Sequence, residues 1–317
     1  MYQAKKSTDW DNINDPIERV EKSRVCYNVQ TQDLKTEPIK LDKGKPALVG
    51  FCSDEGVTRN NGRSGAKKAP DEIRNALGKM AWHGKPDFLI DVGNEICPDK
   101  QLEKAQAEYS QIIGRLLLKQ HFPIGIGGGH EIAIAGYNGI RLAFKKQKLG
   151  IINFDAHFDI RSIEDKGPNS GTSFFQMNDA SFKAGNPFHY LCLGVQDFSN
   201  SNVLFKRAKE LGIIWQTAEN IKANPIQDLN NEIDAFIDEM DIVYLSICMD
   251  VFNEIYAPGV SAPNTMGLEP GTVLSAIQHV MGSGKVVYVD IAETNPEYDI
   301  DGRTTRLAAN ILYHIIK

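Results

Sequence analysis

Short apolar runs recur along the chain, and longer segments that mix apolar and polar residues separate them. The runs cover residues 46–51, 87–92, 122–127, 149–154, 190–195, 212–215, 241–250 and 285–291. Most are apolar over nearly their whole length, which is typical of strands that are buried on both faces. The pattern therefore predicts strands of a mainly parallel sheet.

Several of the intervening segments have apolar residues at helical spacing. These segments are residues 101–120, 226–240 and 271–283, and residues 304–317 are expected to close the chain as a helix. Strands that alternate with helices predict an α/β protein whose parallel sheet is covered on both faces. In such sheets, ligands bind beyond the carboxyl ends of the strands. The residues that follow each apolar run are therefore the first candidates for a functional site.

Four of the runs end in side chains that can ligate a metal. The side chains are His130 after 122–127, Asp155, His157 and Asp159 after 149–154, Cys248 and Asp250 in 241–250, and Glu293 after 285–291. The spacing of Asp155, His157 and Asp159 is the sharpest signal, because alternate residues of an extended chain share a face. Each residue alone has an ordinary explanation, such as a loop histidine or a helix-capping acid. Their joint occurrence at four strand ends favours a metal site.

The ligand types also indicate a chemistry. Oxygen and imidazole ligands with few thiolates suit manganese, iron or zinc. Several carboxylates around two imidazoles can neutralise two divalent ions, which can lower the pKa of a shared water and direct it at an electrophilic carbon. The sequence therefore predicts a hydrolase without a redox cofactor.

The glycine-rich segment GIGGGH, residues 125–130, also allows a dinucleotide-binding or phosphate-binding interpretation. Gly125 and Gly127 match the start of a G-x-G-x-x-G motif, but His130 stands where the third glycine is required. No lysine of a phosphate-binding loop follows. A partial match of this kind is weak, and glycines that allow a tight turn before His130 are the preferred explanation.

Composition narrows the class of protein further. The chain has 317 residues, a net charge of −6 and a pI of about 5.7, which argues against nucleic-acid binding and against an anionic membrane surface. The N-terminal residues are polar, without a signal-peptide core, and no apolar run is long enough to span a bilayer. Five cysteines without close pairs fit free thiols in a reducing compartment. These features predict a soluble protein of the cytoplasm.

The motifs GGGH, DAHFD, S-x-x-x-D and AETNP occur in this order and resemble those of the arginase/agmatinase/formimidoylglutamase superfamily. The resemblance extends over nearly the whole chain. Residues 54–66, the DAHFDIR segment with residues 167–176, and residues 290–309 are similar to the formimidoylglutamase branch in particular. The resemblance implies a three-layer α/β/α fold with an eight-stranded, mainly parallel sheet. It also implies one catalytic domain over residues 1–317, on which residues 1–45 pack as an N-terminal extension.

The resemblance implies two manganese ions and hydrolysis of N-formimidoyl-L-glutamate to L-glutamate and formamide, a step of histidine degradation. Asp155 would bridge the ions, and Glu293 would pair with the cationic nitrogens of the substrate. The metal ligands would be His130, Asp155, His157, Asp159, Asp250 and the residue at position 248. Asp155 and Glu293 are the expected catalytic residues. A bridging hydroxide would attack the formimidoyl carbon.

The other end of this substrate carries two carboxylates. Arg161 lies two residues after Asp159, and its planar guanidinium can hold a carboxylate through two parallel hydrogen bonds. Ser170 and Thr172 can donate further hydrogen bonds. We therefore expect these three residues to bind substrate, although a surface salt bridge is an equally ordinary role for Arg161.

Position 248 departs from the family pattern, since Cys248 replaces an acid that bridges the metals in the family. A thiol has one ligating atom and is softer than manganese prefers. Cys248 could bind as a thiolate, leave one metal weakly held, or mark a site that has lost its metal; it could also be an ordinary buried residue. Thiols at metal sites oxidise, and Cys52 directly follows the apolar run at 46–51. A further hypothesis is therefore a Cys52–Cys248 disulfide that blocks metal binding.

Three functional classes follow from these observations. The first is a formimidoylglutamase, and the second is a related hydrolase of guanidino or amidino compounds, such as an agmatinase or arginase. The third is a metal-deficient, non-catalytic homologue, which Cys248 motivates. The expected partner is the small-molecule substrate, and a homo-oligomer is possible because the family often forms trimers or hexamers.

Overall fold

The computed structural model of the chain describes residues 1–11, 13–36, 44–85, 88–164 and 166–317. Each of the eight apolar runs overlaps a strand, so the prediction of these strands is confirmed; residue 87 of one run lies outside the described residues. The strands are β3 (Pro46–Cys52), β4 (Leu89–Ile96), β5 (Phe122–Ile126), β6 (Leu149–Phe154), β7 (His189–Val195), β8 (Ile214–Thr217), β9 (Ile242–Cys248) and β10 (Val286–Ala292).

The sheet is larger than the predicted eight strands. Two short N-terminal strands, β1 (Tyr2–Gln3) and β2 (Val29–Thr31), bring the total in the described residues to ten. The strand order is β1-β4-β3-β5-β10-β9-β6-β7-β8, and β2 also pairs with β4. Every pairing is parallel except that of β1 with β4. The prediction of a mainly parallel sheet is therefore confirmed, and only the strand count was too low.

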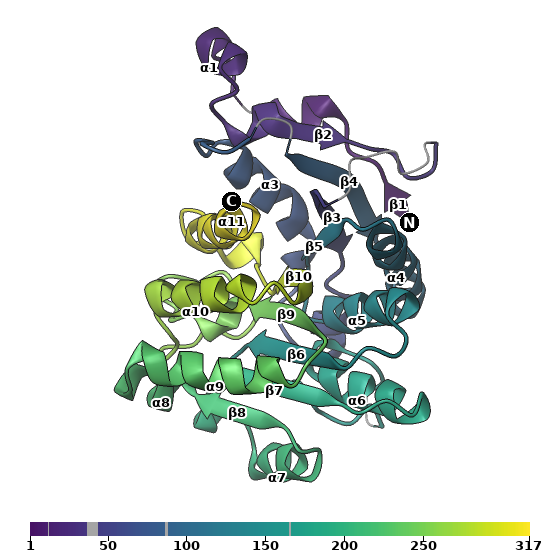
Figure 1. Cartoon of the computed structure of the whole chain (residues 1–317), viewed down its shortest axis with the longest axis vertical. Helices are drawn as coiled ribbons and strands as arrows, with labels where there is room; N and C mark the ends of the chain where they lie inside the picture. Colours follow the sequence, from purple (N-terminus) through teal and green to yellow (C-terminus); the bar gives the residue numbers. More distant parts are fainter. Residues whose placement is uncertain (12, 37–43, 86–87, 165) are drawn as a thin grey trace.

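Helices cover both faces of the sheet and give three layers (Figure 1). One apolar core contains residues of α3 (Ala69–Gly78), α8 (Ala218–Ala223), α9 (Ile226–Asp238), α10 (Pro270–Gly282) and α11 (Arg303–Ile316). The other contains residues of α4 (Leu102–Leu118), α5 (Ile132–Ala143), α6 (Ser173–Lys183) and α7 (Asn202–Glu210). The four helices predicted from helical spacing correspond to α4, α9, α10 and α11. Among the described residues, no helix combines the length and apolarity needed to cross a bilayer.

Residues near the N-terminus pack against β4. The indole of Trp10 is buried and donates a hydrogen bond to Asp91 over 2.9 Å. The buried guanidinium of Arg74, on α3, pairs with the same carboxylate at 2.9 Å. A buried charge is tolerated when it is paired and hydrogen-bonded, so these contacts hold the segment to the sheet.

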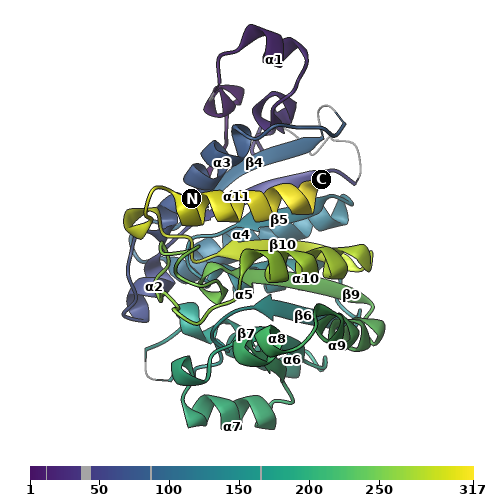
Figure 2. The ribbon, with the colours of Figure 1, turned by 90° about the vertical axis from the view of Figure 1, so that its left-hand side faces the viewer.

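The helix α1 (Pro16–Val20) lies further out, at one end of the molecule (Figure 2). The assignment of residues 1–317 to one domain with an extension at residues 1–45 stays a prediction. Residues 12 and 37–43 of that extension lie outside the described residues.

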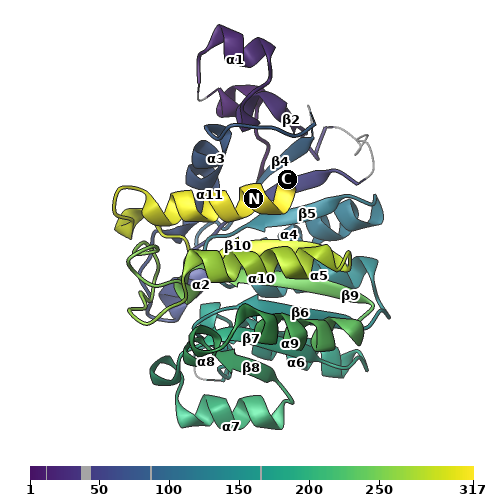
Figure 3. The ribbon, with the colours of Figure 1, turned by 60° about the vertical axis from the view of Figure 1, so that its left-hand side comes forward.

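Side chains of β9 alternate between the two faces of the sheet, which explains how this strand places polar groups on one face. Val243, Leu245 and Ile247 belong to one apolar core, whereas Tyr244 belongs to the other. The polar residues Ser246 and Cys248 alternate with the first set and so share the face of Tyr244. The strands β5, β10, β9 and β6 are consecutive neighbours in the sheet. The segments that follow these four strands consequently begin side by side at the same edge, where α2 (Glu55–Arg59) and the start of α11 also lie (Figure 3).

Candidate metal centre

The residues predicted from the four strand ends come together at this edge. His130 follows β5, the residues Asp155, His157 and Asp159 follow β6, Cys248 ends β9 and Asp250 follows it, and Glu293 follows β10. Two groups of three potential ligands have their atoms within 4.8 Å of one another. One group is His130, Asp155 and Cys248, and the other is Asp155, His157 and Asp250. Asp155 belongs to both groups, so the arrangement has two neighbouring positions that share one carboxylate.

Close backbone approach brings the segment before His130 to this place. A Cβ atom added to Gly128 would lie 1.7 Å from the carbonyl oxygen of Ser53, so no larger residue fits. The Gly128 amide donates to the carbonyl of Phe51, and its own carbonyl accepts from the Glu293 amide, each over 2.8 Å. The glycine therefore serves contact between neighbouring chain segments, which refines the expectation of a tight turn.

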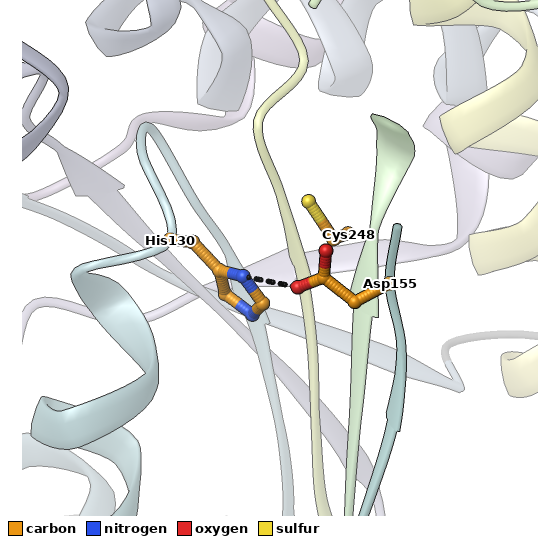
Figure 4. Close-up of side chains that lie close together, drawn as sticks. All are labelled: His130, Asp155 and Cys248. Atoms are coloured by element: carbon orange, nitrogen blue, oxygen red, sulfur yellow. Dashed lines mark ion pairs between the residues drawn. The ribbon is translucent and has the colours of Figure 1, made fainter. Parts of the chain in front are cut away.

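Asp155 lies between the two imidazoles. Its Oδ2 atom is 3.0 Å from Nδ1 of His130, and its Oδ1 atom is 3.5 Å from Nδ1 of His157. On the outer sides, Asp159 Oδ2 is 3.0 Å from His130 Nδ1, and Asp250 Oδ2 is 3.1 Å from His157 Nδ1. The Nδ1 atom of each imidazole thus faces oxygens of two different carboxylates. Figure 4 shows His130 and Asp155 in contact beside Cys248.

Neighbouring polar groups hold these side chains in place. The hydroxyl of Ser246 donates to Asp290 over 2.7 Å and lies 2.9 Å from Nε2 of His130. Because the one hydroxyl proton is used on Asp290, Ser246 must accept from His130 Nε2. Asn153 donates to Asp155 Oδ2 over 3.1 Å. Such contacts fix the orientation and tautomer of a metal-ligating imidazole.

The position of the proton on the His130 imidazole indicates whether a cation fits between this ring and the neighbouring carboxylates. With Nε2 donating to Ser246, Nδ1 of a neutral His130 carries a lone pair and faces carboxylate oxygens of Asp155 and Asp159. This buried Nδ1 atom has no hydrogen-bond partner among the described residues. Two sets of acceptors that face each other in a buried site repel unless a proton or a metal cation lies between them. The donor set of the site therefore fits a divalent metal.

The distances agree with this conclusion. For octahedral coordination with bonds of about 2.1 Å, adjacent ligand atoms lie about 3.0 Å apart. The separations between nitrogen and oxygen atoms here are 3.0, 3.0, 3.1 and 3.5 Å. Carboxylate and imidazole ligands of this kind suit manganese, iron or zinc.

Electrostatics in the protein without metal points the same way. Burial alone would lower the pKa of His130 and His157, but contacts with the carboxylates outweigh it and raise both well above the usual value. Burial raises the pKa of Asp155, but the two imidazoles reverse this effect and hold it well below its ordinary range. Burial and the charge of Asp155 raise the pKa of Asp159. Without a metal, protons on the imidazoles balance the acids.

Cys248 is buried beside these groups, with a side chain that is 1% exposed. Its sulfur belongs to the group with His130 and Asp155 (Figure 4). Burial, and then the charges of Asp155 and Asp250, raise the pKa of this thiol well above its usual value. The thiol is therefore protonated at neutral pH unless a nearby cation deprotonates it, as a coordinated metal does.

A cavity of about 240 Å³ lies over the metal-site residues. His157, Asp159, Cys248, Asp250 and Glu293 line it, together with Asn60, Asn61, Gly62, Arg161, Ser170, Asn200, Leu204, Ser261 and Ala262. Asp159 and Glu293 have φ angles of 48° and 67°, in the left-handed region that is unfavourable for such residues. Strained backbone of this kind is often found at functional sites. The cavity can admit a small ligand directly to the metal-site residues.

Arg161, Ser170 and Glu293, three of the four residues predicted to bind substrate, line this cavity. Arg161 donates to the side-chain oxygen of Asn60 over 3.1 Å, and Asn60 donates to Ser170 over 3.2 Å. Asn60 thus links the two, although the sequence argument assigned it no role. Its only signal was its position in the NNGR segment, which resembles the family.

The structure corrects the expectation for Thr172. Its buried hydroxyl donates to the Asn169 carbonyl and accepts from the Asn169 amide and from Gln176, each over 2.9 Å. Thr172 is not among the described residues that line the cavity. It stabilises the turn before α6 instead of facing a ligand.

The structure also contradicts the proposed disulfide. Cys52 ends β3 and Cys248 ends β9, and β5 and β10 lie between these strands. Three strand spacings separate the two residues by about 14 Å. A disulfide requires Cα atoms within about 7 Å, so the Cys52–Cys248 hypothesis is wrong. Cys52 is also not among the described residues that line the cavity.

Fold and site together define a metal-binding α/β protein with its centre at the carboxyl ends of a parallel sheet. The chain belongs to the arginase family, whose model matches residues 45–317. It is 42% identical over 317 residues to a formimidoylglutamase of Legionella pneumophila (strain Lens), covering 99% of this chain and 97% of that protein.

Solved structures show the same similarity. The crystal structure of formimidoylglutamase from Bacillus subtilis subsp. subtilis str. 168 matches with a TM-score of 0.81 and 27% identity, covering 92% of this chain and 89% of that chain. The crystal structure of a single-residue variant of Trypanosoma cruzi formiminoglutamase with Mn2+2 matches with a TM-score of 0.78 and 25% identity, covering 88% and 94% of the two chains.

Proposed function

We propose that this protein is a formimidoylglutamase that hydrolyses N-formimidoyl-L-glutamate to L-glutamate and formamide with two manganese ions. The observation that carries the proposal is the pair of imidazole–carboxylate positions that share Asp155. Support also comes from the formimidoylglutamase of Legionella pneumophila, which is 42% identical over nearly the full length of both chains. Manganese is the metal named in the similar Trypanosoma cruzi structure.

Each metal position would have its own ligands besides the shared Asp155. His130 and Asp159 would hold one ion, and His157 and Asp250 would hold the other. Cys248 lies with His130 and Asp155 and would add a thiol to that position. When bound, divalent ions supply Lewis acidity and lower the pKa of water, so that water can act as a nucleophile at neutral pH.

Glu293 would bind the cationic nitrogens of the formimidoyl group. Its Oε1 atom accepts from the His130 amide over 2.8 Å, which fixes the carboxylate at the cavity wall. Burial, and then the nearby charges of Glu131 and Asp250, raise its pKa to about 8. A substrate cation placed against this carboxylate would favour its ionised form and make a charge-assisted hydrogen bond.

Arg161 would bind a carboxylate at the other end of the substrate. It lines the same cavity as Glu293, and its contact with Asn60 leaves other N–H groups free to donate. Ser170 would supply a neutral donor. The acidic and cationic ends of N-formimidoyl-L-glutamate thus match the basic and acidic groups of the cavity.

A formamide-release assay with manganese and a reductant tests the proposal. Wild-type protein is expected to release formamide and glutamate in equal amounts from N-formimidoyl-L-glutamate. The Asp250→Asn variant, which removes an ion ligand but keeps the shape, is the negative control. Release of urea from agmatine or arginine without formamide release would instead favour the related guanidino hydrolase.

Cys248 motivates a second candidate, a metal-deficient and non-catalytic homologue. Its buried thiol stands among the ligand atoms where the family has an acid, and a neutral thiol is a poor manganese ligand. Metal analysis of reduced protein separates the two candidates. Bound manganese near two ions per chain supports the enzyme, whereas no bound manganese and no formamide would support the inactive homologue.

We also propose that the protein acts in the cytoplasm, since its five cysteines are all free and free thiols are typical of reducing compartments. A homo-oligomer stays a prediction.

A further inference from the structure

We call the cavity of about 240 Å³ over the metal-site residues the catalytic cavity. A second cavity adjoins it. It has a volume of about 600 Å³ and shares Asn60, Arg161, Asn200 and Leu204 with the catalytic cavity. Its other lining residues are Ser162, Lys166, Asn169, Phe198, Ser199, Ser201, Val203 and Arg207. We call this second cavity the basic chamber. A ligand that contacts Arg161 can therefore reach both cavities at once.

The two cavities differ in charge. The catalytic cavity has three acidic side chains, Asp159, Asp250 and Glu293, on its wall. The basic chamber has the cations Arg161, Lys166 and Arg207, and no acidic side chain of a described residue lines it. This concentration of positive charge stands out in a chain whose net charge is −6. A cavity lined by charges of one sign, here positive, raises the local concentration of anions.

Two of these cations are held in position by neutral groups. Arg207, on α7, donates to the carbonyl of Ile160 over 2.8 Å and lies 5.3 Å from the ring centre of Phe175. Arg161 is held by Asn60. Within the described part of the chain, neither guanidinium has an acidic side chain within ion-pair distance. Preorganised guanidinium groups without a counter-ion are suited to bind carboxylates.

We propose that the basic chamber binds the dicarboxylate part of the substrate, with Arg207 and Lys166 as specificity residues beyond Arg161. The identity of this ligand rests on the proposed function, since N-formimidoyl-L-glutamate has a cationic amidine at one end and two carboxylates at the other. With the amidine against Glu293, Arg161 holds the nearer carboxylate and the chamber cations attract the farther one. The product L-glutamate keeps both carboxylates and binds the same groups.

The same arrangement disfavours a substrate with positive charge at both ends. With its guanidinium at the metal-site residues, agmatine would place its ammonium where the chamber cations lie, and like charges in a confined site repel. The chamber therefore provides selection against cationic substrates as well as attraction for acidic ones.

The chamber is tested with glutarate, a dicarboxylate that lacks both the amidine and the amino group. Calorimetric titration of the manganese-loaded protein compares wild type with Arg207→Gln, Lys166→Gln and the control Lys209→Gln. Lys209 lies on α7 two residues after Arg207 and does not line the chamber. Loss of a charge-assisted hydrogen bond is expected to weaken glutarate binding about 10-fold in Arg207→Gln and about 3-fold in Lys166→Gln. Lys209→Gln is expected to bind within about twofold of wild type.

Because Arg207 also contacts Ile160, its loss could disturb the fold. Arg207→Lys keeps the charge, and it is expected to restore part of the affinity while thermal unfolding and manganese content stay as in wild type. Lys166→Gln removes a charge without removing a contact to a carbonyl. The proposal is overturned if wild type does not bind glutarate, or if Arg207→Gln and Lys166→Gln bind it as wild type does.

A kinetic measurement separates this proposal from the proposed function. In Arg207→Gln, the KM for N-formimidoyl-L-glutamate is expected to rise about 10-fold with kcat nearly unchanged, because the lost contact is remote from the reacting carbon. If wild type releases no formamide but still binds glutarate through Arg207 and Lys166, the proposed function fails and the anion chamber stands. If formamide is released with unchanged KM and unchanged glutarate affinity in both variants, the chamber proposal fails and the proposed function stands.

Discussion

The catalytic cavity and the basic chamber share a wall but differ in charge. Two acids of the catalytic cavity, Asp250 and Glu293, follow closely after strands of the sheet, and Asp159 lies further along the segment after β6. The cations of the chamber come from the segment after β6 and from α7. The rigid sheet can hold acids close together despite their repulsion, because imidazoles or metal ions balance them. Cations on peripheral segments need only attract a ligand. The segment after β6 thus supplies the acid Asp159 as well as the cations Arg161 and Lys166, whereas the cation of α7 lines only the chamber.

Removing the shared ligand is expected to have the largest effect, and only on one of the two cavities. Asp155→Asn should lower kcat by about 10³-fold or more and abolish tight manganese binding, since Asp155 contacts both imidazoles. Glutarate binding to the chamber should stay within about threefold of wild type. Kinetic assays and metal analysis measure the first effect, and titration measures the second. An Asp155→Asn protein that keeps two ions would contradict the assignment.

A change of pH is expected to have the next largest effect, on manganese binding at the metal-site residues but not on glutarate binding in the chamber. The raised pKa of His130 and His157 keeps both imidazoles protonated at neutral pH without metal, and each must lose its proton to ligate. Manganese affinity should therefore rise with pH, by about tenfold per pH unit for each proton released. Glutarate affinity should change little between about pH 6 and 8, because no histidine or acidic side chain of a described residue lines the chamber. Manganese titration in buffers of different ionisation enthalpy counts the protons, and no proton release would contradict the account.

Arg161 lies in both cavities, so its loss tests how they are connected. Arg161→Gln should raise the KM for N-formimidoyl-L-glutamate about 10- to 100-fold, as expected for loss of a charged hydrogen bond. Hydrolysis of formamidine, which lacks carboxylates, should change by less than about threefold. Steady-state kinetics with both substrates measures the difference. Equal losses with both substrates would mean that Arg161 supports the metal site and not the acidic end of the substrate.

Replacing Cys248 is expected to have a smaller effect, which is confined to manganese binding. Cys248→Asp introduces the acid that the resemblance to the family implies at this position and should tighten manganese binding about tenfold, since oxygen suits manganese better than sulfur does. Cys248→Ser is the matched control of similar size without the added charge, and glutarate binding should not change in either variant. Manganese titration under reducing conditions measures the effect. Weaker binding in Cys248→Asp would show that the thiol itself suits the site.

Much of the fold could be predicted because the strands have strong signals. The runs that became β3 to β10 are almost wholly apolar, as a doubly covered parallel sheet requires. The strands β1 and β2 span two and three residues, and their burial is only partial. Such short segments have no periodicity to detect, and they form because β4 offers an edge.

The candidate metal site could be predicted because its residues follow strands, whereas the chamber could not, because part of it lies on a helix. His130, Asp155 and Asp250 follow strands, and parallel strands place their carboxyl ends at one edge. Strand order does not follow from local pattern, so the two strands that separate Cys52 from Cys248 were not foreseen. The chamber brings together residues after β6 and on α7, and their proximity depends on how that helix packs.

Short-range hydrogen bonding also misled the sequence argument. Thr172 and Ser170 have similar hydroxyls and lie two residues apart, but the hydroxyl of Thr172 is used within its own turn. Asn60 was missed because its partners, Arg161 and Ser170, lie about a hundred residues further along the chain. Contacts of this range come only from the folded structure.

The most direct test of the central claim is the ratio of kcat/KM for N-formimidoyl-L-glutamate to that for agmatine, measured with manganese and reductant. An acidic catalytic cavity beside a basic chamber predicts a ratio of at least about 10³, since discrimination by unpaired or repelling charges reaches several kcal/mol. The ratio should fall in Arg207→Gln and fall further in Arg161→Gln. A wild-type ratio near or below one would contradict the account.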